Sequence, residues 1–71
     1  MNMISVNSSN ISSIGYDENS ETLRVSFNNG GLYDYHSVPK HLHEGLMSAS
    51  SHGSYLDAYI KKGGYSVTKL S

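Results

Sequence analysis

The fold is decided largely by residues 23–36, which read LRVSFNNGGLYDYH. From Leu23 to Phe27 apolar and polar side chains alternate, and this period of two predicts a half-buried strand. The following Asn29-Gly30 tolerates the positive φ angles of a tight hairpin turn. A second strand is then expected through residues 32–36, so the stretch predicts a β-hairpin.

The residues before the hairpin predict one more strand. Residues 11–16 place Ile14 and Tyr16 on one face, and residues 17–20, DENS, supply four turn-forming residues in a row. Together with the hairpin they predict a three-stranded antiparallel meander with one face to cover.

The second half of the chain predicts two short helices. Pro39 suits the first position of one helix, and Gly45 within it is explained by a close approach to the sheet. The other helix is expected to begin with a capping box at Ser54 and Asp57 and to end at Gly63-Gly64. We expect residues 65–68 to form a short last strand beside residues 3–6 at a sheet edge.

These elements define one α+β domain over residues 1–71. We expect a small antiparallel sheet, made of a three-stranded meander and short terminal strands, with two α-helices packed on one face.

Composition limits the classes of function. Without cysteine there are no disulfides or thiolate metal sites, so a thin core is stabilised by packing or by a second copy of the chain. The net charge of −1 gives no global attraction to nucleic acid, so any such contact requires a local patch. No apolar run approaches the roughly 20 residues that span a bilayer. Residues 1–7 lack the features of a secretory signal, so we expect a cytoplasmic protein with no membrane contact.

The chain resembles the KTSC domain family, named after the C-terminus of some lysyl-tRNA synthetases and found as single-domain proteins of bacteria and phages. The similar positions span about residues 6 to 66 and comprise Ser8-Ser9-Asn10-Ile11, Gly15-Tyr16-Asp17, Leu23, Val25-Ser26-Phe27, Asn29-Gly30, the Tyr-x-Tyr motif Tyr33-Asp34-Tyr35, Val38-Pro39, Ala49-Ser50, Gly53 and Tyr55. The synthetase context of the family implies RNA as a ligand.

The role of Tyr33 and Tyr35 depends on the register of the hairpin. A strict two-residue turn places both tyrosines beside Arg24 on the sheet face opposite Leu23. That face would be a stacking platform with a cation, suited to nucleobases at about 1–3 kcal/mol each.

A three-residue loop with a bulge at glycine makes both tyrosines part of the core, opposite Val25 and Leu23. We favour this register, because the two-residue turn would bury Asp34 and His36 beside apolar side chains. The platform then disappears.

A second candidate lies at residues 50–55, SSHGSY, where hydroxyls and a glycine precede a helix whose free N–H groups attract a phosphate or carboxylate. Ordinary capping by Ser51 or Ser54 is the alternative explanation. Lys61 could bind a phosphate or could stabilise the C-terminal end of that helix. The candidate ligand-binding residues are Tyr33, Tyr35, Arg24, Ser50, Ser51, Gly53, Tyr55 and Lys61.

The histidines do not predict a metal site or catalysis. His41 and His43 are two apart on the predicted helix and point about 200° apart, so they cannot hold one ion together. No spacing indicates a nucleophile with its base and orienting acid. We therefore expect no catalytic residue, no metal and no cofactor.

Two functions remain as predictions. The first is a small non-catalytic module that binds RNA or a phosphate-bearing nucleotide. The second is a phage-encoded or bacterial homo-oligomeric protein that sequesters a signalling nucleotide or inhibits a host defence protein. Self-association is expected because a symmetric contact would enlarge a thin core.

Overall fold

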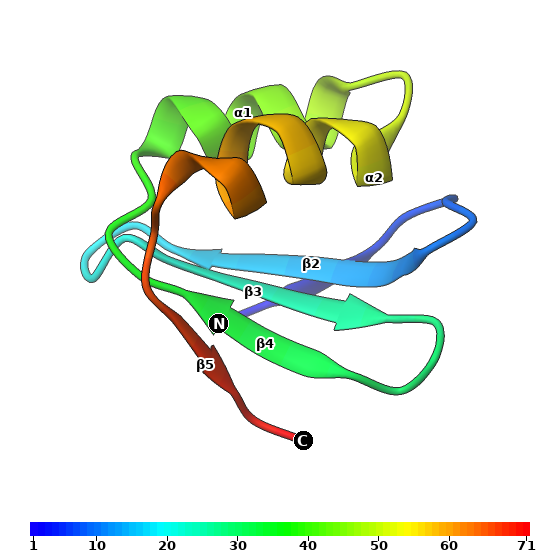
Figure 1. Ribbon diagram of the computed structural model, residues 1–71, viewed down its shortest axis with the longest axis horizontal. Coiled ribbons are helices and arrows are strands. Elements are labelled where there is room, and N and C mark those ends of the chain that lie inside the picture. Colours follow the sequence, from blue (N-terminus) through cyan, green and yellow to red (C-terminus); the bar gives the residue numbers. More distant parts are fainter.

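A five-stranded antiparallel sheet carries all the helices on one face (Figure 1). The computed structural model describes residues 1–71 and confirms the α+β class. Its strands follow one another in chain order across the sheet: β1 (Met3–Ser5), β2 (Ile11–Asp17), β3 (Thr22–Phe27), β4 (Leu32–Tyr35) and β5 (Val67–Lys69). The helices are α1 (Lys40–Ser48) and α2 (His52–Tyr55), which continues through the π-helical segment η1 (Leu56–Ile60) into the 3-10 turn η2 (Lys61–Gly63).

The β3–β4 hairpin has the bulged register that burial of polar groups favoured. Val25 pairs with Tyr33 and Leu23 pairs with Tyr35, so both tyrosines share the apolar face of β3. Gly30 has a φ of 96°, the left-handed conformation that a bulge at glycine requires. The two-residue turn, and the tyrosine platform that depended on it, are therefore not formed.

The terminal strands lie at opposite edges of the sheet. β1 pairs with β2, and β5 pairs with β4, so the expected pairing of the two terminal segments with each other is wrong. The helical segment ends beside β4, where the backbone N–H of His36 donates to the carbonyl of Ser66 at 2.8 Å. This contact directs the end of the chain along β4 rather than across the sheet to β1.

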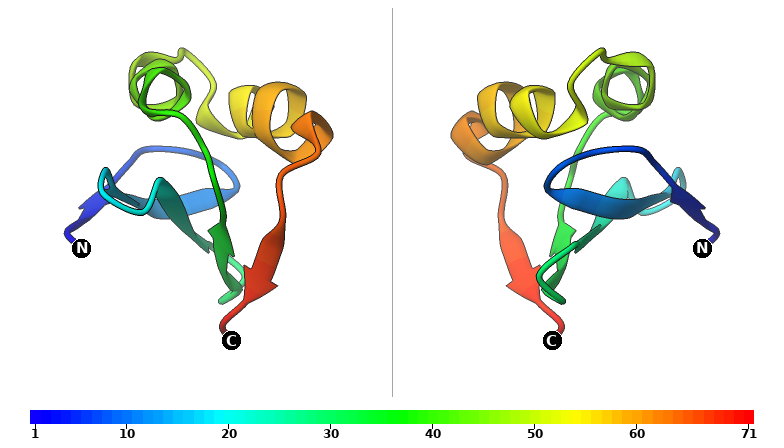
Figure 2. Two further views of the ribbon diagram at one scale, coloured as in Figure 1. Left: turned by 90° about the vertical axis from the view of Figure 1, so that its left-hand side faces the viewer. Right: turned by 90° about the vertical axis from the view of Figure 1, so that its right-hand side faces the viewer.

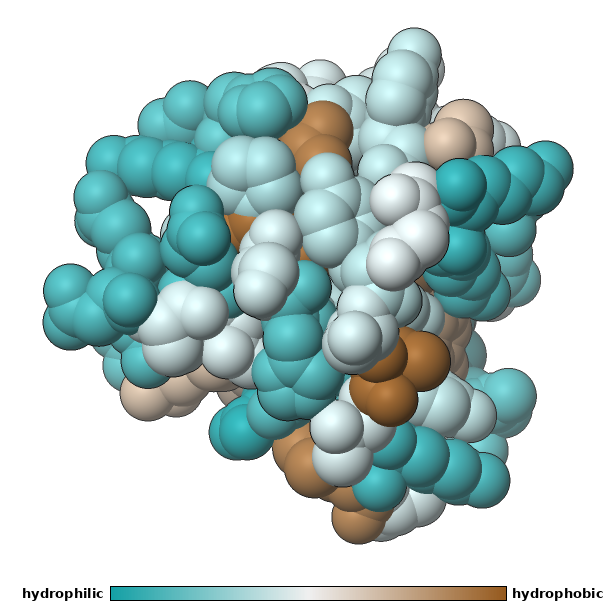
Figure 3. Space-filling model, turned by 60° about the vertical axis from the view of Figure 1, so that its left-hand side comes forward, coloured by the Kyte–Doolittle hydropathy of each residue, from teal (hydrophilic) through white to brown (hydrophobic).

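The core lies between the helices and the covered face of the sheet. Figure 2 shows both helical segments on the same side, while the twist of the sheet turns β4 and β5 steeply relative to β2. Nine buried apolar side chains form this core: Ile11, Ile14, Leu23, Val25, Tyr35, Val38, Leu46, Leu56 and Ile60. The face drawn in Figure 3 is mostly hydrophilic or neutral, with only small separate apolar patches.

The helices begin and end close to the expected positions. Two expectations about them, the residue that caps α2 and the contact made by Gly45, need correction. Ser51, not Ser54, caps α2, and its hydroxyl accepts from the backbone N–H of Ser54 at 3.2 Å. Gly45 permits a close approach of the Tyr55 ring, not of the sheet, because a Cβ at that position would overlap the Tyr55 hydroxyl. Gly64 ends the helical segment with a φ of 82° as expected. No helix has the length and apolar character needed to cross a membrane.

Candidate ligand-binding groove

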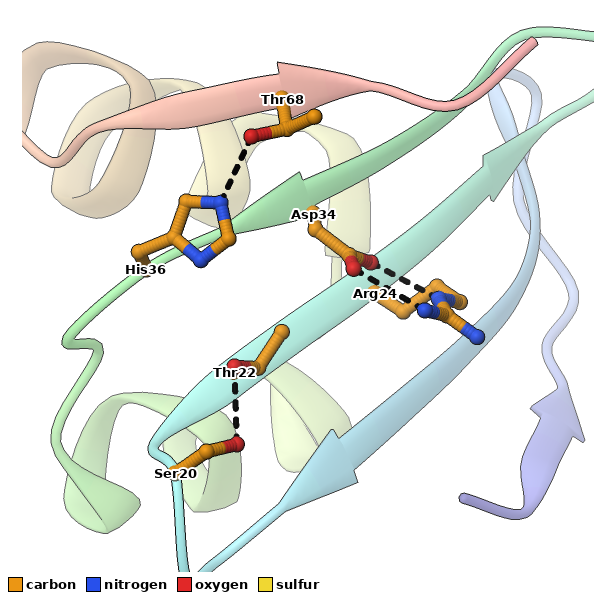
Figure 4. A network of polar contacts seen from close by, with 6 residues as sticks. All are labelled: Ser20, Thr22, Arg24, Asp34, His36 and Thr68. Atoms are coloured by element: carbon orange, nitrogen blue, oxygen red, sulfur yellow. Dashed lines mark hydrogen bonds and ion pairs between the residues drawn. The ribbon is translucent and has the colours of Figure 1, made fainter.

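Arg24 lies on the open face of the sheet, away from the tyrosines. It is opposite Asp34 on the neighbouring strand, and its Nε and Nη2 donate to the two carboxylate oxygens at 2.7 and 3.0 Å (Figure 4). This two-point contact raises the pKa of Arg24, first through the hydrogen bond and then through the negative charge. Arg24 is thus engaged in holding a buried carboxylate, and the arrangement beside Tyr33 and Tyr35 that the two-residue turn would have given is not formed.

The open face also carries polar contacts between strand side chains. His36 Nε2 lies 2.8 Å from Thr68 Oγ1, and the hydroxyl of Ser20 donates to that of Thr22 at 2.9 Å (Figure 4). These contacts tie β5 to the end of β4 and close the β2–β3 turn. We interpret the part of the open face formed by β3, β4 and β5 as a structural polar surface.

Two other histidines make structural contacts. The His43 ring stacks on Tyr16 with centroids 4.6 Å apart, and burial lowers the pKa of this histidine. His52 Nδ1 lies 2.8 Å from the carbonyl of Leu46, which links the start of α2 to α1. No group of three or more His, Cys, Asp or Glu residues is placed to hold a metal ion.

An aromatic hollow opens where the β3–β4 hairpin meets the end of the helical segment. It measures about 390 Å³, within the range of small-ligand sites. It is lined by Phe27, Asn29, Tyr33, Tyr35, Lys61, Tyr65 and Val67. The Phe27 and Tyr33 rings meet edge to face with centroids 5.6 Å apart, and Tyr35 forms the buried floor. Burial raises the pKa of Tyr35, which keeps its hydroxyl neutral.

A second, more polar hollow adjoins the aromatic one. It measures about 450 Å³ and is lined by Ser9, Asn10, Phe27, Asn28, Asn29, Gly53, Leu56 and Lys61. The two hollows share Phe27, Asn29 and Lys61, and we refer to them together as the groove. The side chain of Asn10 makes no hydrogen bond within the protein, so its amide is free to bind a polar group of a ligand.

Lys61 is the cation of the groove. Its Nζ lies 5.1 Å from the centroid of the Phe27 ring, a cation–π contact, and no carboxylate pairs with it. Its neighbour Lys62 differs, because its ammonium lies 3.5 Å from the carboxylate of Asp57. The groove therefore presents a positive charge whose counterion is not supplied by the protein.

The structure brings together four of the eight predicted site residues. Gly53, Lys61, Tyr33 and Tyr35 line the groove, whereas Arg24, Ser50, Ser51 and Tyr55 do not. Ser51 is occupied in capping α2, which is the alternative that the sequence left open. Tyr55 packs against α1 and Tyr59, with ring centroids 4.6 Å apart, and Ser50 lies in the exposed connection between the helices.

Several lining residues were absent from the prediction. Phe27 had been placed on the apolar face of β3, but its position at the end of that strand leaves the ring only partly covered. In the bulged register Tyr33 pairs with Val25, and Phe27 is the next residue of β3 on the same face. Contact between Tyr33 and Phe27 could therefore have been inferred. Tyr65 and Val67 reach the groove only because β5 pairs with β4, which the sequence did not reveal.

This arrangement is that of a small α+β protein in which a helical hairpin covers one face of an antiparallel meander, and in this chain an aromatic groove lies at one end. Residues 7–65 match the family model of the KTSC domain. The crystal structure of a KTSC domain protein from Yersinia pestis has a TM-score of 0.92 and 38% sequence identity, covering 99% of this chain and 97% of that one. The chain belongs to the KTSC domain family.

Two relatives show the two settings in which similar sequences occur. A protein of Stutzerimonas stutzeri is 34% identical over 61 residues, with 86% of each chain covered. A lysine–tRNA ligase of Nostoc punctiforme is 33% identical over 51 residues, which is 72% of this chain but 9% of the ligase. Similar sequences thus occur both in small proteins and within much longer ones.

Proposed function

We propose that this protein is a small non-catalytic module that binds RNA or a phosphate-bearing nucleotide in the groove. The observation that carries the proposal is the ammonium group of Lys61, which lies over Phe27 without a carboxylate partner. An unpaired cation next to partly exposed aromatic rings suits a ligand that combines a phosphate with a planar base.

The two hollows offer different chemistry to such a ligand. The rings of Phe27, Tyr33 and Tyr65 offer a stacking surface, worth about 1–3 kcal/mol for each base stacked on an aromatic side chain. The free amide of Asn10 can donate to and accept from base edges or ribose. Because the net charge is −1, affinity would come from this local pairing of ring and cation rather than from a general basic surface.

The lysine–tRNA ligase relatives support RNA over other ligands with phosphate and base. In those proteins the similar segment is part of a lysine–tRNA ligase, whose name includes an RNA. A module of this kind that contacts RNA would act where RNA is found, in keeping with the expected cytoplasmic location. The alternative function predicted from the sequence is sequestration of a free signalling nucleotide. That ligand would need the same groove.

Binding should depend on Lys61 and not on its neighbour. We suggest measuring fluorescence anisotropy of a short labelled RNA at low salt with wild type, Lys61→Gln and the matched control Lys62→Gln. Loss of one charged contact should weaken binding by about tenfold or more in Lys61→Gln, while Lys62→Gln should bind as wild type does.

Two outcomes would contradict the proposal: no binding of RNA or of nucleotides to wild type at low salt, or equal binding by the two lysine variants. Circular dichroism spectra of both variants check that the fold is retained.

The β1 edge supports a second function, self-association. β1 is an edge strand with all three residues exposed, and Ile4 is 51% exposed. Residues 2–16 carry no charged side chain and no proline, although charges and prolines are the usual devices that protect sheet edges from pairing. We propose that two copies pair through β1 around a two-fold axis.

The mass of the protein in solution tests this second function. Light scattering should detect a dimer whose population increases with protein concentration. The Ile4→Lys variant should give the monomer mass. A monomer mass for wild type at millimolar concentration would exclude pairing through β1.

A further inference from the structure

A third hollow extends the groove along the hairpin. It measures about 290 Å³, is lined by Asn29, Gly30, Gly31, Tyr33, Lys69 and Ser71, and shares Asn29 and Tyr33 with the aromatic hollow. The three hollows therefore adjoin one another through shared lining residues, and we refer to them together as the track.

The track contains both basic side chains that lack an ion pair. Arg24 pairs with Asp34, Lys40 with Glu18 and Lys62 with Asp57, which accounts for three of the five basic residues. The remaining two, Lys61 and Lys69, line the track. No Asp or Glu side chain lines any of the three hollows.

Pairwise relations link the two free lysines through the two aromatic rings. Lys61 lies over Phe27, the Phe27 ring meets Tyr33, and Tyr33 is the cross-strand partner of Lys69. Cross-strand partners place their Cβ atoms about 4.5–5.5 Å apart on the same face of the sheet. The order of groups along the track is thus cation, ring, ring, cation.

We propose that the track binds a single-stranded oligonucleotide of at least two nucleotides, with successive phosphates at Lys61 and Lys69 and bases on the rings between them. The inference rests on the proposed function and specifies its ligand. Lys69 lines only the third hollow and Lys61 only the other two, so we expect a single phosphate to contact one of the two ammonium groups. We expect no binding of a base-paired duplex along the track, since its internal base faces are stacked on one another and cannot reach the rings.

The dependence of affinity on ligand length and salt tests this inference. We suggest calorimetric titration with uridine mono-, di- and trinucleotides at several salt concentrations. Affinity should increase from the mononucleotide to the longer ligands. Because the trinucleotide would make two phosphate contacts, its affinity should fall more steeply with salt than that of the mononucleotide.

The variant Lys69→Gln should reduce the salt dependence of trinucleotide binding to that of the mononucleotide and leave the affinity for the mononucleotide unchanged. Lys69→Arg should retain the wild-type salt dependence, and the control Lys40→Gln, at the ion pair with Glu18, should change nothing. Deoxyribose trinucleotides in parallel show whether the sugar contributes: equal binding extends the ligand class to single-stranded DNA, and weaker binding restricts it to RNA.

A mononucleotide that binds as tightly as the trinucleotide, with Lys69→Gln indistinguishable from wild type, would overturn this inference and leave the proposed function intact. No binding of any of the ligands would overturn both.

Discussion

Replacement of Tyr35 by alanine tests the hairpin register directly. The Tyr35 side chain is 5% exposed and belongs to the nine-residue core. An aromatic side chain buries about 150–250 Å², which corresponds to about 4–6 kcal/mol at 25 cal/mol/Å². Measured aromatic-to-alanine substitutions in cores cost about 3–5 kcal/mol, and we expect Tyr35→Ala to lie in that range.

This loss is large against the whole stability of the domain. At about 0.05–0.15 kcal/mol per residue, a chain of 71 residues has an unfolding free energy of about 4–11 kcal/mol. Urea unfolding followed by far-UV circular dichroism should show the midpoint lowered by about 2–3 M or more, for an m-value near 1–1.5 kcal/mol/M. Tyr35→Phe is the matched control and should cost less than about 1 kcal/mol, because the Tyr35 hydroxyl makes no hydrogen bond within the protein.

If Tyr35→Ala kept an unfolding free energy within 1 kcal/mol of wild type, Tyr35 would not be part of the core. The two-residue turn would then be the correct register.

Three further measurements probe other elements of the fold. Burial lowers the pKa of His43, so the unfolded state takes up a proton at a higher pH than the folded state does. The unfolding free energy should therefore fall as pH drops below about 6.5. A His43→Gln variant with the same pH dependence as wild type would refute this. Ser51→Ala removes the cap of α2 and should cost about 1 kcal/mol in urea unfolding, whereas no loss would show that the cap is not formed. Gly30→Ala should cost about 1 kcal/mol because the φ of 96° disfavours a Cβ, and an unchanged midpoint would argue against the bulge.

The hairpin shows how far the sequence could be used. Alternation identified β3, and Asn29-Gly30 identified the turn, but neither fixes the register, because a shift of one residue moves every side chain to the other face. The cost of burying Asp34 decided between the two registers, and the structure confirms that choice. In the observed register the Asp34 carboxylate is still largely covered from solvent, because Arg24 pairs with it on the open face.

The groove was only half predicted, for a reason of topology. Tyr33 and Lys61 were identified from residue type alone, as an aromatic and a cation. Tyr65, which lines the groove, and Lys69, which lines the third hollow of the track, depend on the pairing of β5 with β4, a contact between segments more than thirty residues apart in the chain. No local pattern in a three-residue strand specifies which edge of the sheet it joins. The same long-range pairing explains why the terminal strands were placed incorrectly.

The central claim is that the aromatic groove is the ligand site. The NMR resonances that shift when a ligand is added test it most directly. A uridine trinucleotide titrated into isotope-labelled protein should perturb the NMR resonances of Phe27, Tyr33 and Lys61 in a concentration-dependent manner. Resonances of Arg24 and its surroundings on the open face should remain unchanged. Shifts confined to the open face, or none at low salt, would contradict the account.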